Sequence, residues 1–185
     1  MKKRIYFLSL ILLLSVAAGC GPDSQLTYDP DQAKFIMPLG QSYNYSDVLV
    51  TRVVDGDTLL LASGERVRLI GIDTPEVHES GKLRRDAQKM QQSAGEIRKL
   101  GRRASEFTKA LVEGKRVSLE FDVERYDRYK RLLAYAYLKD GTFVNARIVQ
   151  EGYASLLTIP PNVKYADLFL KLYREARENN RGLWK

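Results

Sequence analysis

Short apolar runs begin at residue 48 and alternate with polar positions, a pattern that predicts β-strands. The runs are VLVTRVV (48–54), DTLLLA (57–62) and RVRLIGI (66–72). The third run alternates around Val67 and Leu69, as a strand with one buried face does, and Ser63-Gly64 supplies a tight turn before it. We therefore predict three antiparallel strands in a meander.

The next segment, residues 82–113, has helical periodicity. Leu100, Ala104, Phe107 and Leu111 recur at spacings of three and four, which places them on one helical face. We predict a helix that is interrupted near Gly95 or Gly101 and stops at Gly114.

Two more strands and two more helices follow. VSLEFDV (117–123) and LLAYAYL (132–138) predict strands, and residues 143–151 and 164–179 predict helices. The last helix carries one apolar stripe, formed by Tyr165, Leu168, Phe169, Leu172 and Ala176. Five short strands with a helix between the third and fourth favour an α+β domain, built on a five-stranded Greek-key barrel of the OB type with three helices.

The N-terminus has the pattern of an export signal. Lys2, Lys3 and Arg4 precede the apolar stretch 5–18, which is too short for a comfortable transmembrane helix. It ends in VAAGC, which resembles a bacterial lipobox, the signal in which the cysteine is lipidated. The alternative is an ordinary signal peptide that happens to contain Cys20.

The domain organisation follows from this signal. We predict a lipoprotein signal peptide over 1–19, a flexible linker over 20–46 that starts at lipidated Cys20, and a folded domain over 47–185. The domain is then a monomer outside the cytoplasm, in the cell envelope. Its acyl chains tether it to the membrane without spanning the bilayer, and later cleavage of the linker would release a secreted form.

Composition removes several kinds of site. The single cysteine excludes an intramolecular disulfide and a cysteine-rich zinc site, and the single histidine, His78, receives no role. The chain has a net charge of +7, and residues 48–185 hold 26 Lys and Arg against 19 Asp and Glu. This excess favours polyanions such as nucleic acid or anionic lipid.

Four carboxylates lie at strand ends of the meander. Asp55 and Asp57 belong to DGDT, and Asp73 and Glu76 belong to DTPE. Asp-Gly alone is a turn signal, but antiparallel pairing brings the start of the second strand near the end of the third. Neighbouring carboxylates repel unless a cation lies between them, and oxygen ligands favour calcium or magnesium.

Two arginines accompany these carboxylates. A single arginine usually belongs to a solvated face, but Arg68 on the third strand and Arg131 at the start of the fifth converge on the same end of the barrel. Guanidinium groups match phosphate oxygens bidentately. A hard cation, paired carboxylates and arginines together suit phosphodiester hydrolysis.

These motifs carry a family resemblance. The segments VVDGDTLLL, RVRLIGIDTPE, GRRASEFTKAL, DRYKRLLAY, VNARIVQEGYA and NNRGLW resemble the staphylococcal nuclease (thermonuclease) family in the same order, from about residue 48 to Lys185. The resemblance implies an OB-fold barrel with three helices and a Ca²⁺-dependent nuclease that acts on DNA and RNA.

The resemblance also implies roles for residues around the metal. Asp57 and Asp73 match the calcium-binding carboxylates, and Thr74 matches the threonine whose backbone carbonyl contacts the ion. Glu76 matches the general base that activates water. Asp55 matches a carboxylate that is more often a supporting group than a ligand.

The remaining matches concern the phosphate. Arg68 and Arg131 match the two arginines that hold the scissile phosphate, and Tyr129 matches a tyrosine that lines this site. The family usually has glycine where this chain has Lys130. If the position needs positive φ, lysine costs about a kcal/mol, and its charge lies near the phosphate.

Two other segments depart from the family pattern. SLLTIPPN (155–162) has no aromatic residue where the secreted prototype stacks tyrosines on the nucleoside, so we expect weaker or less base-selective binding. Residues 82–103 hold eight basic residues and only Asp86 and Glu96 as acids. This segment is either a solvated helix face or an electrostatic track for nucleic acid.

Two other functions compete with a nuclease. One is a catalytically weak or inactive nucleic-acid-binding module of the same fold, and the other is a solute-binding lipoprotein. Nuclease-like domains that have lost catalysis usually lack catalytic residues. In this chain, all of the residues matched to the family's site are present: Asp57, Arg68, Asp73, Glu76 and Arg131. The chain is also short for a two-lobed solute binder.

Overall fold

The computed structural model describes residues 27–29, 34–36, 42–77, 81, 88 and 93–185. The predicted signal peptide, Cys20 and His78 lie outside these residues, as does most of segment 82–92. None of the described helices is both long and apolar enough to cross a membrane.

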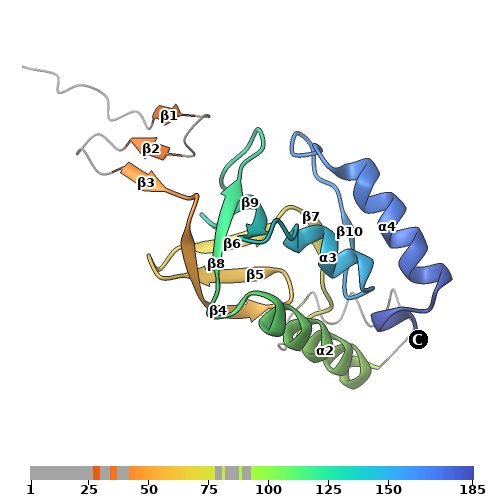
Figure 1. Cartoon of the computed structure of the whole chain (residues 1–185). Helices are drawn as coiled ribbons and strands as arrows, with labels where there is room; N and C mark the ends of the chain where they lie inside the picture. Colours follow the sequence, from red (N-terminus) through yellow and green to blue (C-terminus); the bar gives the residue numbers. More distant parts are fainter. Residues whose placement is uncertain (1–26, 30–33, 37–41, 78–80, 82–87, 89–92) are drawn as a thin grey trace, which may run out of the picture.

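Five strands close into a barrel in the order β4-β5-β6-β9-β8 (Figure 1). All neighbours are antiparallel except β6 and β9, which are parallel. Buried aliphatic residues such as Val50, Leu59, Val67 and Ala134 fill its interior. The predicted five-stranded barrel is therefore confirmed. The strands are β4 (Val48–Asp55), β5 (Thr58–Leu61), β6 (Arg66–Leu69), β8 (Arg116–Glu120) and β9 (Leu132–Leu138).

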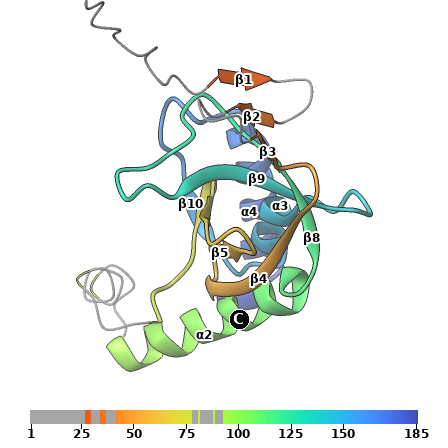
Figure 2. The ribbon, with the colours of Figure 1, turned by 90° about the vertical axis from the view of Figure 1, so that its left-hand side faces the viewer.

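Three α-helices of the described chain surround the barrel, as predicted. Figure 2 shows α2 running beneath the barrel next to β4, and α3 packs against α4. A short 3₁₀ helix, η1, ends the chain. The bounds are α2 (Ala94–Val112), α3 (Val144–Gln150), α4 (Ala166–Glu178) and η1 (Gly182–Trp184). On α4 the predicted stripe is wrong at Leu168, which is 39% exposed.

The predicted interruption of the helical segment lies at Ser93, near Gly95. Ser93 has extended backbone and caps α2 through a capping box with Glu96, and α2 then runs without a break through Gly101. Its fully buried stripe is also rotated from the predicted one, because small and polar side chains turn toward the barrel. That stripe consists of Ile97, Gly101, Ala104, Ser105, Thr108 and Val112.

The predicted strand 66–72 is in fact two strands. The chain turns at Gly71, whose φ of +83° suits glycine, and a Cβ there would lie 2.4 Å from the Phe169 ring. Beyond the turn, β7 (Gly71–Asp73) pairs with β10 (Ser155–Leu157), a strand that the sequence pattern did not predict. The buried Asn145 Nδ2 donates to Ile70 O beside the turn. This break redirects Asp73 out of the barrel wall.

The predicted linker contains secondary structure. Three short strands, β1 (Thr27–Asp29), β2 (Lys34–Ile36) and β3 (Ser42–Asn44), form an antiparallel sheet. Tyr45 then enters the barrel core with 2% exposure, and its hydroxyl donates to Glu65 Oε1 at 2.7 Å. The barrel core thus begins at Tyr45, and a chain cut at residue 47 would lose this side chain.

Glu120, the last residue of β8, lies in a polar cluster with Tyr137, Lys164 and Tyr165. Burial raises its pKa, but hydrogen bonds from Lys164, Tyr137 and Tyr165 outweigh this effect and hold the pKa below its ordinary value of 4.5. A carboxyl whose pKa is depressed by folding contributes stability above its unfolded pKa and loses it as the pH falls through the folded pKa.

We therefore expect Glu120→Gln to cost about 1–2 kcal/mol of unfolding free energy at pH 7. The difference should shrink as the pH falls below 4.5 and through the lowered folded pKa, because Glu120 then becomes neutral in both states. Urea unfolding at a series of pH values measures this, with the exposed Glu106→Gln as control. If the difference in unfolding free energy between wild type and Glu120→Gln stayed constant with pH, the stabilising role of the Glu120 carboxylate would be contradicted.

Candidate active site

Asp57 is the centre of a buried hydrogen-bond network. Its carboxylate is 5% exposed, and Oδ2 accepts hydrogen bonds from Thr74 N at 2.8 Å and from Thr74 Oγ1 at 3.1 Å. Oδ1 accepts one from Thr58 Oγ1 at 3.1 Å. The two carboxylate motifs therefore meet at one end of the barrel, as the strand pairing predicted.

Arg68 bridges two of the predicted metal-binding carboxylates. Its Nη1 lies 3.0 Å from Asp57 Oδ2, and its Nη2 lies 2.9 Å from Asp73 Oδ1. The pairing of Arg68 with Thr58 across β5 and β6 sets this position. Asp57 and Asp73 thus both face the Arg68 guanidinium, which holds the two carboxylates on the same side of the site.

Asp55 lies beside Asp57, and its Oδ1 accepts a hydrogen bond from the Asp57 N–H at 3.4 Å. Burial and the adjacent charge of Asp57 raise the pKa of Asp55 to about 7.

Arg131 is held by Asp127, a residue that the sequence analysis did not single out. Arg131 Nε and Nη2 each lie 2.7 Å from Asp127 Oδ2, and Nη1 lies 3.4 Å from Thr58 Oγ1. Burial raises the pKa of Asp127, but the hydrogen bonds and charge of Arg131 outweigh it and lower the pKa. The sequence does contain a signal for this ion pair, because Asp127 lies four residues before Arg131, at the start of a predicted strand.

Tyr129 contacts two arginines, whereas Lys130 stands out for its backbone conformation. The Tyr129 ring is 65% exposed, and the guanidinium carbons of Arg128 and Arg131 lie 4.8 Å and 5.5 Å from its centroid. Lys130 is exposed, with φ +61°. The residue that replaces the expected glycine thus does adopt the left-handed conformation.

The predicted catalytic side chains border one cleft of about 880 Å³. Glu76 joins them from the segment after β7, and its Oε1 accepts a hydrogen bond from Val77 N at 3.0 Å. The lining also includes Leu157 and Ile159, which are 40% and 59% exposed. The cleft therefore combines a charged wall with an apolar one. On the charged side lie Asp55, Asp57, Arg68, Asp73, Glu76, Asp127 and Arg131, and Tyr129 also lines the cleft.

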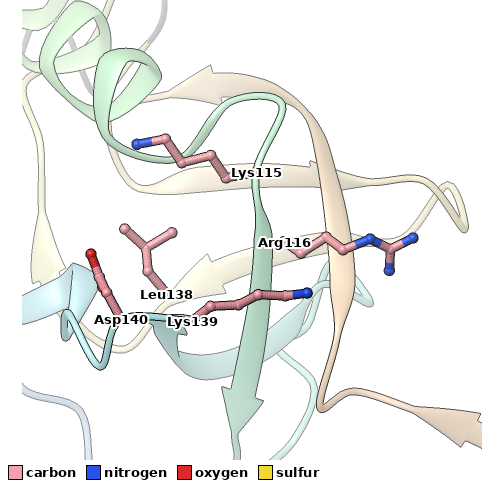
Figure 3. Close-up of a pocket in the computed structure, with 5 residues that line it drawn as sticks. All are labelled: Lys115, Arg116, Leu138, Lys139 and Asp140. Carbon is pink, nitrogen blue, oxygen red and sulfur yellow. The ribbon is translucent and has the colours of Figure 1, made fainter.

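A second hollow, of about 500 Å³, lies at the other end of β9 (Figure 3). It is lined by Leu138, Asp140 and three basic side chains, those of Lys115, Arg116 and Lys139. Asp47 pairs with Arg116 at 3.0 Å and with Lys139 at 3.3 Å, so one carboxylate offsets part of the positive charge of this hollow. It contains none of the predicted site residues, so the larger cleft is the candidate active site.

The donor set in the cleft fits a hard cation. Asp57 and Asp73 present oxygen atoms within about 3 Å of the same guanidinium, and oxygen is the donor that calcium and magnesium prefer. Within the described ranges, no group of three or more His, Cys, Asp or Glu could hold a metal. Further ligands would have to be backbone oxygens, water or substrate.

A family model described as "Staphylococcal nuclease homologue" matches residues 66–185. The chain belongs to the staphylococcal nuclease family. It is 38% identical over 179 residues to a protein named Thermonuclease from Staphylococcus intermedius, which covers 95% of this chain and 90% of the relative. The Thermonuclease of Staphylococcus hyicus is 31% identical over 138 residues, or 73% of each chain.

A Bacillus subtilis protein named Endonuclease YncB is 33% identical over 143 residues, covering 75% of this chain and 61% of the relative. The family model spans Arg68, Asp73, Glu76 and Arg131, but it begins after Asp57. The family match therefore does not include Asp57. Its place beside Asp73 is shown by the contacts of both carboxylates with Arg68.

The positive φ of Lys130 leads to a stability prediction. Lys130→Gly should raise the unfolding free energy by about 1 kcal/mol, because glycine adopts this conformation without a Cβ clash. Lys130→Ala removes the same charge but keeps the Cβ, so it should not give this gain. Urea unfolding of the two variants separates strain from charge, and equal gains would contradict the role of strain.

Proposed function

We propose that this chain hydrolyses phosphodiester bonds of DNA and RNA in a calcium-dependent reaction. The observation that carries the proposal is the cleft that Asp57, Arg68, Asp73, Glu76 and Arg131 all line. Relatives named as thermonucleases and endonucleases support the nuclease activity.

Asp57 and Asp73 would hold the calcium ion, together with the backbone carbonyl of Thr74. When bound, the ion supplies Lewis-acid charge that neutralises the phosphate in the transition state. Millimolar calcium outside cells can fill a site with few protein ligands, which agrees with the proposed location.

The two arginines bind and orient the scissile phosphate. Asp127 fixes the Nε side of the Arg131 guanidinium and leaves Nη1 on the Thr58 side of the cleft. Arg68 reaches the same region from β6. Because guanidinium stays protonated, both act by charge rather than by proton transfer. Loss of either should cost about 10²–10³ in rate, by analogy with a lost oxyanion donor.

Glu76 acts as the general base. Its carboxylate takes a proton from a water molecule, directly or through a second water, and this water attacks the phosphorus in line with the leaving 5′-oxygen. A water molecule protonates that oxygen. General-base catalysis of this kind contributes about 10²–10⁴ in rate.

The apolar part of the cleft would contact a base next to the scissile phosphate. Leu157 and Ile159 offer aliphatic surface there, without the aromatic stacking that is worth about 1–3 kcal/mol per base. We therefore expect weak binding with little preference between bases. The alternative function, a silent nucleic-acid-binding module, would keep the arginines but not need Glu76.

Replacing Glu76 by Gln tests the enzyme against the binding module. We expect acid-soluble release from denatured DNA to fall about 10²–10⁴-fold in Glu76→Gln, and to stop when calcium is chelated from the wild-type chain. Glu124→Gln is the matched control, because Glu124 lines the same cleft without a proposed role. A folded wild-type chain that binds DNA without releasing products would favour the binding module.

We also propose that the chain is anchored to the cell envelope through lipidated Cys20. The basic and apolar pattern before this residue supports the anchor. Cys20→Ser should abolish incorporation of labelled palmitate and move the protein out of the membrane fraction. Because Cys20 is the only cysteine, palmitate label or membrane association that persists in the variant would contradict the anchor.

A further inference from the structure

Between Ile97 and Val112, the buried face that α2 turns toward the barrel is small and polar. Gly101, Ala104, Ser105 and Thr108 are all buried there, and the last is fully so. Larger side chains would bury more apolar surface. The small side chains of this stripe therefore allow neighbouring backbone to lie close to the helix, at the expense of hydrophobic burial.

Gly101 brings the helix directly against the backbone that carries the proposed base. A Cβ at this position would lie 2.6 Å from Pro75 O, 2.8 Å from Glu76 O and 2.9 Å from the Glu76 carbonyl carbon. Residues 74–77 follow β7 and belong to no strand (Figure 2). Strand pairing therefore does not fix Glu76, whereas contact with α2 does.

Thr108 contacts the other carboxylate motif from the same helix. Its buried Oγ1 donates to Gly56 O at 2.8 Å, in the turn between Asp55 and Asp57. Seven residues separate Gly101 from Thr108, which is about two helical turns, or roughly 10 Å along the axis. Both positions therefore lie on one face of a rigid element.

We infer that α2 sets the position of Glu76 relative to Asp57, with Gly101 and Thr108 as positioning residues for catalysis. Gly101 acts through Glu76, and Thr108 acts through the turn that carries Asp57. This inference rests on the proposed function. A misplacement of about 1 Å can cost about 100-fold in rate, so contacts that only support the site can still determine its activity.

Gly101→Ala tests the first contact. The added methyl must push the Pro75–Glu76 backbone away, so we expect kcat to fall at least 10-fold while KM for denatured DNA changes less than 3-fold. Gly95→Ala is the matched control, because it adds the same methyl to the same helix with Ser93 Oγ no nearer than 3.7 Å. The full chain, purified in detergent, is used for all variants, and thermal unfolding verifies that each is folded.

A double-mutant cycle separates positioning from a general structural effect. If Gly101 acts through the Glu76 carboxylate, Gly101→Ala should cost little further rate in a Glu76→Gln background. Single-turnover assays with excess enzyme measure this small residual rate. The same loss in both backgrounds, or full activity of a folded Gly101→Ala variant, would overturn the inference.

Thr108 provides a second test that does not require Gly101→Ala to fold. Thr108→Val keeps the shape and removes the hydroxyl, so the Asp55–Asp57 turn loses its anchor. We expect calcium affinity, measured by titration calorimetry, to fall about 5–10-fold, and Thr108→Ser to restore it. Unchanged calcium affinity in Thr108→Val would overturn this part. An inactive wild type and Gly95→Ala would instead reject the proposed function.

Discussion

The site depends on the burial of one carboxylate. Asp57 is almost inaccessible to solvent, so its charge has to be compensated by protein groups. Thr74 provides two hydrogen bonds and Arg68 an ion pair; Arg68 comes from β6 and Thr74 from the segment directly after β7. Satisfying Asp57 therefore brings the DGDT and DTPE motifs together, with Asp73 and Glu76 next to them in sequence.

The rest of the fold holds these segments in place from outside. The turn at Gly71 takes Asp73 out of the barrel wall, and β10 pairs with the redirected strand. Asp127 fixes Arg131 on the other side of the cleft. Helix α2 approaches the site with glycine and threonine rather than with large apolar residues. The cleft thus lies among a barrel, a small sheet and a helix, each of which fixes a different charged group.

Much of this could be predicted from local patterns. Alternation of apolar residues indicates the barrel strands, and strand order brings Asp57, Arg68 and Asp73 to one end. The features that were not predicted depend on contacts between distant segments. Gly101 was a candidate helix break because the helical periodicity does not show that the backbone of Pro75 and Glu76 packs against it. Similarly, β10 is short and irregular, and only its pairing with β7 identifies it. Tyr45 was assigned to the linker because its two partners, Glu65 and Phe121, are distant in the sequence.

The parallel pairing of β6 with β9 also has a consequence for the order of synthesis. Arg68 lies opposite Leu133 in this pair, and the two strands are far apart in the chain. Such non-local pairing forms slowly, because the loop between the strands must close first. A growing chain has no closed barrel, and hence no complete set of phosphate-binding arginines, until β9 has been made.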